Sequence, residues 1–316
     1  MRICCLGDAR TDIVIPYGAQ LEFEAGRGKQ AYVEMKTGGT SANCANLLGR
    51  LGADVMLAGP VYEGAEGEFL IKTMRKNGVD LSCVERSKQR FSIFAVVDSD
   101  GERHFMYWKD DDSFYPDFTD YDFSKIPLEG TVIVLSGANI GAECSEPMVA
   151  YAEECSSQGI TVALDLNLRF FSDSIPEEYL ELLRRAARCS KILFGSGTEE
   201  FGPVFGYDDL MEAGRILSKG RTVVLRRGRK APLLAQDGAV KEIPFTAVKA
   251  VSTVGAGDAF DAGFLYGMTL GLSMEDCVRA GNAVSGWHIS HEDRFSVPAR
   301  EEIIQQIRKD SLLAGK

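Results

Sequence analysis

The sequence lacks several features that mark whole classes of protein. It has no excess of positive charge: 35 Lys and Arg stand against 46 Asp and Glu, a net charge of -11, which argues against a general nucleic-acid or membrane-surface binder. No segment approaches the roughly 20 consecutive apolar residues that span a bilayer. The apolar stretch near the N-terminus is also too short for a secretory signal peptide. We therefore expect a cytoplasmic protein that binds neither nucleic acid nor membranes.

Clear metal, disulfide and standard phosphate-loop motifs are missing as well. None of the eight cysteines forms a Cys-x-x-Cys pair, so we expect reduced, mostly buried thiols rather than a zinc site. His288, His291 and Glu292 have helical spacing that could bind a metal, but a surface helix end explains them more simply. The pattern Gly-x-x-x-x-Gly-Lys-[Ser/Thr] is absent, and residues 26–30 are interpreted as a hairpin turn.

From residue 131 onward, strand-like and helix-like segments alternate. Residues 131–135, 161–165, 191–194 and 222–226 predict strands, and residues 147–158, 176–187 and 208–219 predict helices between them. This alternation predicts an α/β fold whose parallel-sheet core carries helices on both faces. Ligands then gather at the carboxyl ends of the strands, where Asp165, Gly195 and Arg226 would lie.

The first third of the chain has a different pattern. Residues 12–15, 31–36, 91–98 and 103–108 predict strands that mostly lack a following helix, and residues 98–101 have hairpin-turn chemistry. We predict a small β-sheet lid from about residues 12–36 and 91–110, inserted on the core of one domain that spans residues 1–316. Residues 41–51, between the two lid segments, have helical spacing.

Residues 251–266 give the strongest chemical signal. A strand-like run leads into Gly255-Ala256-Gly257, and an apolar helix follows. Small residues let the backbone approach a ligand closely, and the N–H groups at a helix start point toward an anion such as a phosphate. Asp258 lies in the first helical turn, where it could accept the proton of an attacking hydroxyl during phosphoryl transfer. A plain strand-to-helix connection is the alternative.

Two separate segments resemble the signatures of the ribokinase-like (PfkB) family of carbohydrate kinases. Residues 253–258 are similar to the C-terminal signature, and Gly38, Gly39, Asn43 and the helix that follows are similar to the N-terminal Gly-Gly-x3-Asn-x-Ala signature. The resemblance implies a ribokinase-like core with a β-sheet lid. It also implies that a sugar binds beneath the lid and that ATP binds across the carboxyl ends of the strands.

The resemblance further implies roles for single residues. Asp258 matches the catalytic base, and the amides of Gly255, Ala256 and Gly257 match the anion hole for the transferred phosphate. Sugar-side positions are matched by Asp12, Gly38, Gly39 and Asn43, and nucleotide-side positions by Ser196, Glu199, Arg226, Gly228, Gly257 and Asn282. Glu199 matches a residue linked to Mg²⁺, through water. For Asp12, a turn residue at a strand end is the alternative.

Some positions depart from the family pattern. Ser252 stands where the family usually has an Asp that helps to hold a monovalent cation beside the anion hole, which argues against such a cation here. Ser196 replaces the Asn of the family's Asn-x-x-Glu, and residues 62–64 replace a Gly-x-Asp. Mg²⁺ is still expected, because a bridging metal neutralises the phosphate oxygens.

Two segments that bear on the substrate resemble those of the 2-keto-3-deoxygluconate kinase and fructokinase branches of the family. Residues 165–169 are similar to their Asp-x-Asn-x-Arg segment, and residues 107–109 to the Tyr-Tyr-Arg of the first branch. Tyr107, Lys109 and Arg169 are therefore predicted to bind substrate, and the two cations would suit a sugar acid. Structural roles for Arg169 and Lys109 are the alternative.

Three further expectations concern function and assembly. A nucleoside kinase of the same family is the nearest alternative to a sugar kinase, and it would need an apolar or aromatic base pocket under the lid instead of cations. A non-catalytic sugar or nucleotide sensor is the alternative from another class, favoured by Ser252 and Ser196 and opposed by the intact turn and Asp258. The open strand edges of the lid predict a homodimer.

Overall fold

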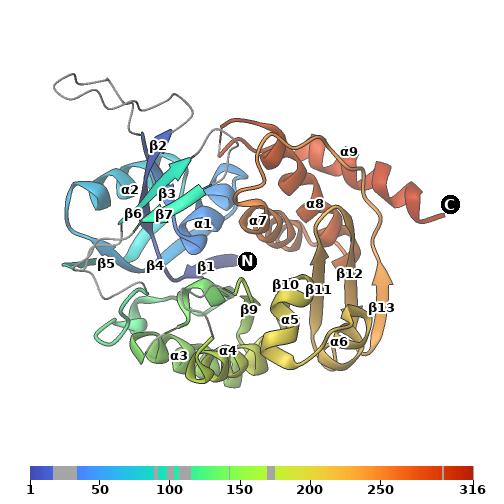
Figure 1. Ribbon diagram of the computed structural model, residues 1–316, viewed down its shortest axis with the longest axis horizontal. Coiled ribbons are helices and arrows are strands. Elements are labelled where there is room, and N and C mark those ends of the chain that lie inside the picture. The colour runs from blue at the N-terminus through green and yellow to red at the C-terminus, as the bar shows by residue number, and fades with distance from the viewer. Residues whose placement is uncertain are drawn as a thin grey trace.

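The computed structural model describes residues 1–16, 34–88, 92–97, 103–106, 115–141, 143–168, 175–293 and 295–315. Within these ranges the chain forms two sheets, and helices cover both faces of the larger one (Figure 1). The predictions for Tyr107, Lys109 and Arg169, and for turns at residues 26–30 and 98–101, lie outside the described residues.

Among the described residues, the larger sheet has nine strands in the order β13-β12-β11-β10-β9-β8-β1-β4-β5. They are β1 (Arg2–Leu6), β4 (Val55–Tyr62), β5 (Asp80–Ser87), β8 (Thr131–Ser136), β9 (Thr161–Asp165), β10 (Ile192–Ser196), β11 (Thr222–Arg227), β12 (Lys230–Gln236) and β13 (Ala239–Glu242). Neighbours from β5 to β11 are parallel, whereas the β11–β12 and β12–β13 pairs are antiparallel. The predicted parallel sheet is confirmed, and β4, β5, β12 and β13 extend it.

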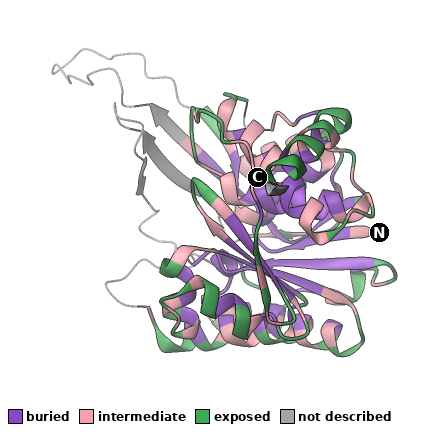
Figure 2. Cartoon of the chain, turned by 90° about the vertical axis from the view of Figure 1, so that its right-hand side faces the viewer, coloured by how far each residue is buried: buried purple, intermediate pink, exposed green. Residues whose placement is uncertain are grey.

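The helices form two layers around this sheet. One layer holds α1 (Thr40–Arg50), α2 (Ala65–Lys76), α7 (Ala256–Thr269), α8 (Met274–Ser290) and α9 (Arg300–Ser311); the other holds α3 (Glu146–Ser157), α4 (Glu177–Cys189), α5 (Gly197–Phe205) and α6 (Leu210–Leu217). A hydrophobic core lies on each face of the sheet, and each strand contributes side chains to both cores because alternate side chains point to opposite faces. Ile3 and Cys5 enter one core, and Cys4 and Leu6 enter the other, so that buried residues follow the sheet (Figure 2).

Local signals explain which helices the sequence revealed. The predicted helices correspond to α1, α3, α4, α6 and α7, whereas α2, α5 and α9 were not predicted. Of these, α5 contains Pro203, a residue that disfavours helix interiors. Short 3-10 turns occur at Phe123–Lys125, Gly137–Asn139, Glu143–Ser145 and Leu312–Gly315. No helix formed by the described residues is long and apolar enough to cross a membrane.

The smaller sheet consists of strands from two separate parts of the sequence. Its order is β3-β2-β6-β7, with β2 (Arg10–Pro16), β3 (Glu34–Gly38), β6 (Ser92–Val97) and β7 (Arg103–Met106). β2 pairs antiparallel with β3 and parallel with β6, and β6 pairs antiparallel with β7. This sheet matches the predicted two-segment lid. Since β2 begins four residues after β1 ends, it stands directly beside the carboxyl edge of the main sheet.

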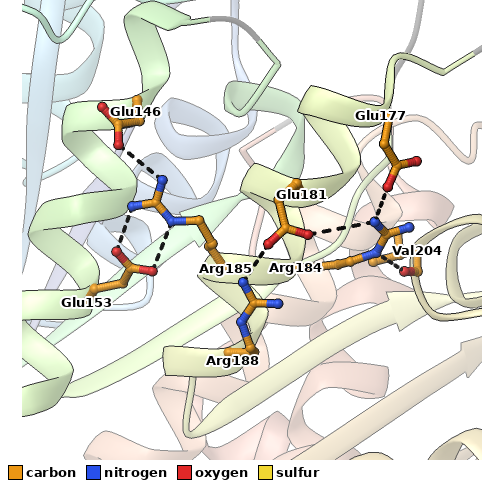
Figure 3. A network of polar contacts seen from close by, with 8 residues as sticks. All are labelled: Glu146, Glu153, Glu177, Glu181, Arg184, Arg185, Arg188 and Val204. Carbon is orange, nitrogen blue, oxygen red and sulfur yellow. Dashed lines mark hydrogen bonds and ion pairs between the residues drawn. The ribbon is translucent and has the colours of Figure 1, made fainter.

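An ionic network joins three helices on the outer face of the molecule (Figure 3). Arg185 of α4 bonds Glu146 at 3.0 Å and Glu153 at 2.8 Å, both in α3. The neighbouring Arg184 donates to the Val204 carbonyl of α5 at 2.7 Å. Exposed ion pairs contribute only about 0–1 kcal/mol each. The network therefore links α3, α4 and α5 but adds little stability.

Candidate active site

The turn before α7 brings a tight backbone bend and a carboxylate together. Gly255 is the N-cap of α7 with a φ of 77°, a left-handed conformation that glycine adopts without steric cost. The Ala256 N–H donates back to the Thr253 carbonyl at 3.2 Å, so one of the three predicted anion-hole amides is bonded within the turn. The positive end of the α7 dipole still lies at this turn, where it favours a bound anion.

Asp258 in the first turn of α7 is held by Asn43 of α1. The Asn43 Nδ2 donates to Asp258 Oδ2 at 2.7 Å, although the two residues are 215 positions apart in the sequence. Both side chains are buried, so water competes little for this bond. The residues predicted from the two separate signatures therefore meet, and Asn43 fixes the orientation of the Asp258 carboxylate.

The other predicted sugar-side residues lie where β2, β3 and α1 meet. Asp12 is buried in β2, and its carboxylate lies over Gly38: a Cβ at Gly38 would be 2.1 Å from Asp12 Oδ1. Gly39 is the N-cap of α1 with a φ of 88°, and a Cβ there would be 2.8 Å from Asp8 Oδ2. Two glycines thus leave the space that two buried carboxylates fill.

A buried ion pair next to this region was missed by the sequence analysis. Arg10 Nε donates to Asp8 Oδ2 at 2.7 Å, and both side chains are buried. Asp8 also supports the start of α1, because its backbone carbonyl accepts the Ala42 N–H at 3.1 Å. An Arg and an Asp two residues apart at the start of a strand show no distinctive spacing, so no local pattern indicated this pair.

Arg226 has carboxylate partners in the structure, although the sequence predicted a role beside the nucleotide phosphates. Its guanidinium binds Asp165 Oδ1 at 2.5 Å and Asp261 Oδ1 at 3.0 Å, and all three side chains are nearly buried. A Cβ at Gly257 would lie 3.1 Å from Arg226 Nη1, so the group lies directly under the anion-hole turn. Burial, together with the charge of Asp165, raises the pKa of Asp261 well above its ordinary value, and Arg226 opposes this shift.

The remaining strand-end residues surround the start of α5 and a hairpin. Ser196 ends β10 and Glu199 is exposed in the first turn of α5. The adjacent Glu200 is buried and accepts the Ser196 N–H at 2.6 Å, a role that the sequence analysis did not assign. Gly228 occupies the turn between β11 and β12 with a φ of 61°. Glu199 is thus the acid of this segment that remains accessible.

Asn282 of α8 lines a cavity of about 390 Å³. The cavity lies between α8, α9 and the segment after β13, and its lining includes Val248, Gly286 and Trp287. The Asn282 Nδ2 is buried and makes no hydrogen bond to any described residue. A buried amide without a partner costs about 1–3 kcal/mol. A polar group of a ligand in this cavity would satisfy it.

The interpretation of His288 as part of a surface helix end was wrong. His288 is 6% exposed, and its Nε2 lies 2.9 Å from the Val254 carbonyl oxygen. Its helical neighbour His291 is exposed and stacks on Trp287, with ring centroids 4.2 Å apart. The error arose because α8 turns one side toward the anion-hole turn at its C-terminal end. Across the described ranges, no group of three or more His, Cys, Asp or Glu residues could hold a metal ion.

Known proteins are similar to this chain over nearly its whole length. A 5-dehydro-2-deoxygluconokinase from Clostridium perfringens is 28% identical over 288 residues, which cover 86% of this chain and 84% of that protein. A fructokinase double mutant from Vibrio cholerae O395, solved in a fructose-, ADP- and potassium-bound form, superposes with a TM-score of 0.79 at 23% identity, over 97% and 98% of the two chains.

A second solved structure and a family model extend the comparison. Aminoimidazole riboside kinase from Salmonella enterica, complexed with aminoimidazole riboside and an ATP analog, superposes with a TM-score of 0.76 at 20% identity, over 97% of this chain and 100% of that one. The model described as pfkB family carbohydrate kinase matches residues 1–298. The two signatures, the sheet order and these matches agree: the chain belongs to the pfkB family of carbohydrate kinases.

Proposed function

We propose that this protein transfers the γ-phosphate of ATP to a primary hydroxyl of a sugar or sugar acid. The observation that carries the proposal is the 2.7 Å bond from Asn43 to Asp258. It joins the helix that follows the sugar-side glycines to the helix start that can bind a phosphate. A hydroxyl held at the first place and a phosphoryl group held at the second would meet beside one oriented carboxylate.

In this proposal, each step of the transfer has its own group. The substrate hydroxyl oxygen forms a bond to the γ-phosphorus while the bond to the β–γ bridging oxygen breaks, and ADP leaves with that electron pair. Asp258 accepts the hydroxyl proton. The amides of Gly255 and Gly257 and the dipole of α7 would stabilise the charge on the transferred group. Asn43 keeps the Asp258 carboxylate in place.

ATP would bind across the carboxyl ends of the strands, near Ser196 and Gly228, with Arg226 held by its two carboxylate partners beneath the anion-hole turn. The cavity beside Asn282 would take the base end of the nucleotide, where the buried amide gains a partner. Mg²⁺ fits Glu199, because this exposed carboxylate is a hard oxygen ligand, and Mg²⁺ usually keeps several waters and binds one or two carboxylates plus substrate phosphates. When bound, the ion neutralises phosphate oxygens.

A sugar acid is the substrate class that we favour. The similarity to a 5-dehydro-2-deoxygluconokinase supports it, as does the predicted pairing of Arg169 and Lys109 with an acidic group. Asp12, Gly38, Gly39 and Asn43 would bind the hydroxyls, and Tyr107 would line the same site. A nucleoside kinase is the second candidate, since an aminoimidazole riboside kinase has the same fold.

The assembly and location of the protein are further proposals. We propose a cytoplasmic homodimer that forms through the lid, because β3 and β7 are the edge strands of the smaller sheet and open edges can pair. The lid, from about residues 12–36 and 91–110, would be part of a single kinase domain. Light scattering of the purified protein tests the dimer, and a monomer at micromolar concentration would refute it.

A coupled ADP-release assay with Mg²⁺ tests the activity against panels of sugars, sugar acids and nucleosides. We expect Asp258→Asn to abolish turnover while calorimetry still detects ATP binding. The matched control is Glu212→Gln, which changes an exposed acid in the first turn of α6 and should leave turnover unchanged. Normal turnover of Asp258→Asn would refute the mechanism. A wild-type protein that binds ATP and phosphorylates nothing in the panels would instead be a sensor.

A further inference from the structure

We propose that His288 positions the anion hole from α8 and makes this kinase independent of a monovalent cation. The inference rests on the proposed function, since it assigns a role beside the same phosphate site. The side chain lies under Gly255: a Cβ at Gly255 would be 3.0 Å from His288 Nε2. The imidazole is therefore in contact with Gly255, the N-cap residue of α7.

One face of α8 holds the whole turn. Ser285 Oγ donates to the Ala256 carbonyl at 2.9 Å, and His288 Nε2 donates to the Val254 carbonyl at 2.9 Å. The Ile289 carbonyl accepts the Val251 N–H at 2.7 Å and the Ser252 N–H at 3.2 Å. Positions three and four apart lie on the same side of a helix, so these three residues act together. α7 and α8 lie side by side in the structure (Figure 1), which lets one helix support the start of the other.

The His288 contact controls the direction of an anion-hole donor. A carbonyl oxygen accepts hydrogen bonds and cannot donate, so the hydrogen lies on His288 Nε2. The Val254 carbonyl and the Gly255 N–H belong to one planar peptide unit and point in opposite directions. When the imidazole holds the carbonyl oxygen toward α8, the Gly255 N–H is directed away from α8, toward the phosphate site.

The same geometry does not suit a monovalent cation. Ions such as K⁺ are bound by several carbonyl or carboxylate oxygens that replace water. Here residue 252 is a serine, and its hydroxyl already accepts the Val254 N–H at 3.4 Å. The Val254 carbonyl is bonded by an N–H donor. The turn therefore lacks a carboxylate at position 252, and the imidazole N–H competes with a cation for the Val254 carbonyl oxygen and supplies the support instead.

The first test uses the unmodified protein. Its turnover is measured in KCl and in tetramethylammonium chloride, whose large cation cannot enter a site of K⁺ size. We expect kcat to agree within about twofold, and Tm to be equal in the two salts, because a cation that bound the folded state would raise Tm. A tenfold loss of kcat or a clear fall in Tm without K⁺ would overturn the inference.

The second test changes the donor. His288→Leu removes it and should lower kcat by about tenfold or more, since a misdirected anion-hole amide costs that order of rate, with little change in the KM for ATP. His288→Gln places an amide N–H at a similar reach and should retain kcat within about threefold. His291→Ala, at the exposed residue that directly follows α8, is the control. A kcat for His288→Leu equal to that of His291→Ala would overturn the positioning role.

The third test does not need activity. The chain has three histidines, so an NMR spectrum of ¹⁵N-histidine-labelled protein contains three ring systems, which His288→Gln and His291→Ala assign. We expect His288 to carry its hydrogen on Nε2, with slow exchange. An Nδ1–H tautomer would overturn the inference. A wild type without kinase activity but with the expected tautomer would refute the proposed function and leave the His288 contact standing.

Discussion

Arg226→Met is expected to destabilise the protein strongly while leaving ATP affinity nearly intact. In the native protein the guanidinium bonds Asp165 at 2.5 Å and Asp261 at 3.0 Å beneath the anion-hole turn. Removal of the cation leaves two buried carboxylates without their partner. Breaking a buried ion pair in this way costs about 3–5 kcal/mol. At roughly 2–3 °C per kcal/mol for a large domain, Tm should fall by about 6–15 °C.

The loss of stability in Arg226→Met should depend on pH and on the Asp261 carboxylate. The pKa of Asp261 is already raised by burial and by the charge of Asp165. A carboxyl group with a raised folded pKa stabilises the fold at low pH, and this contribution is lost as pH rises through the folded value. Arg226 opposes that rise, so the deficit of Arg226→Met should grow from acid toward neutral pH. Arg226→Met with Asp261→Asn should regain about half of the lost stability, because one buried charge is removed.

Calorimetric and circular-dichroism melts at pH 5, 6.5 and 8 measure these effects, and a double-mutant cycle gives the coupling between Arg226 and Asp261. Titration with ATP at 20 °C measures the affinity of each variant. A Tm within about 2 °C of the wild type, combined with a tenfold weaker ATP affinity, would refute the structural role. It would restore the phosphate-binding role that the sequence predicted for Arg226.

Three other substitutions test separate parts of the site. Gly255→Ala introduces a side chain at φ 77° against His288; it should lower the free energy of unfolding by about 1–2 kcal/mol and abolish most of the turnover. The control Gly220→Ala, at φ 72° with open space around it, should lose the same stability and keep normal turnover. Equal kcat values for the two variants would contradict the anion hole. Asn43→Leu should lower kcat by about tenfold or more at unchanged ATP affinity, measured by steady-state kinetics; normal kcat would show that Asp258 needs no orienting bond. Asn282→Ala should raise the KM for ATP severalfold without lowering the Tm of the ligand-free protein, because its buried Nδ2 has no partner among the described residues. An unchanged KM would remove the cavity from the nucleotide site.

Much of the fold and part of the site could be predicted because their signals are local. Alternating β-branched and helical segments after residue 131 predicted the parallel sheet, since periodicity reports which side of an element is buried. The turn around Gly255 could be recognised because only small residues permit that backbone. α5 was missed because it contains Pro203. Proline disfavours helix interiors, but tertiary packing overrides that local preference here.

Local patterns in the sequence were enough to identify the residues of the turn, the acid in the first turn of α7 and the glycines before α1. What those residues touch follows from the packing of distant elements. That packing placed Asn43 on Asp258, gave Arg226 two carboxylate partners and turned His288 under Gly255. Periodicity and turn chemistry act over only a few residues. Contacts between distant elements depend on how α1, α7 and α8 pack together, and no local pattern records which face of one helix meets which residue of another.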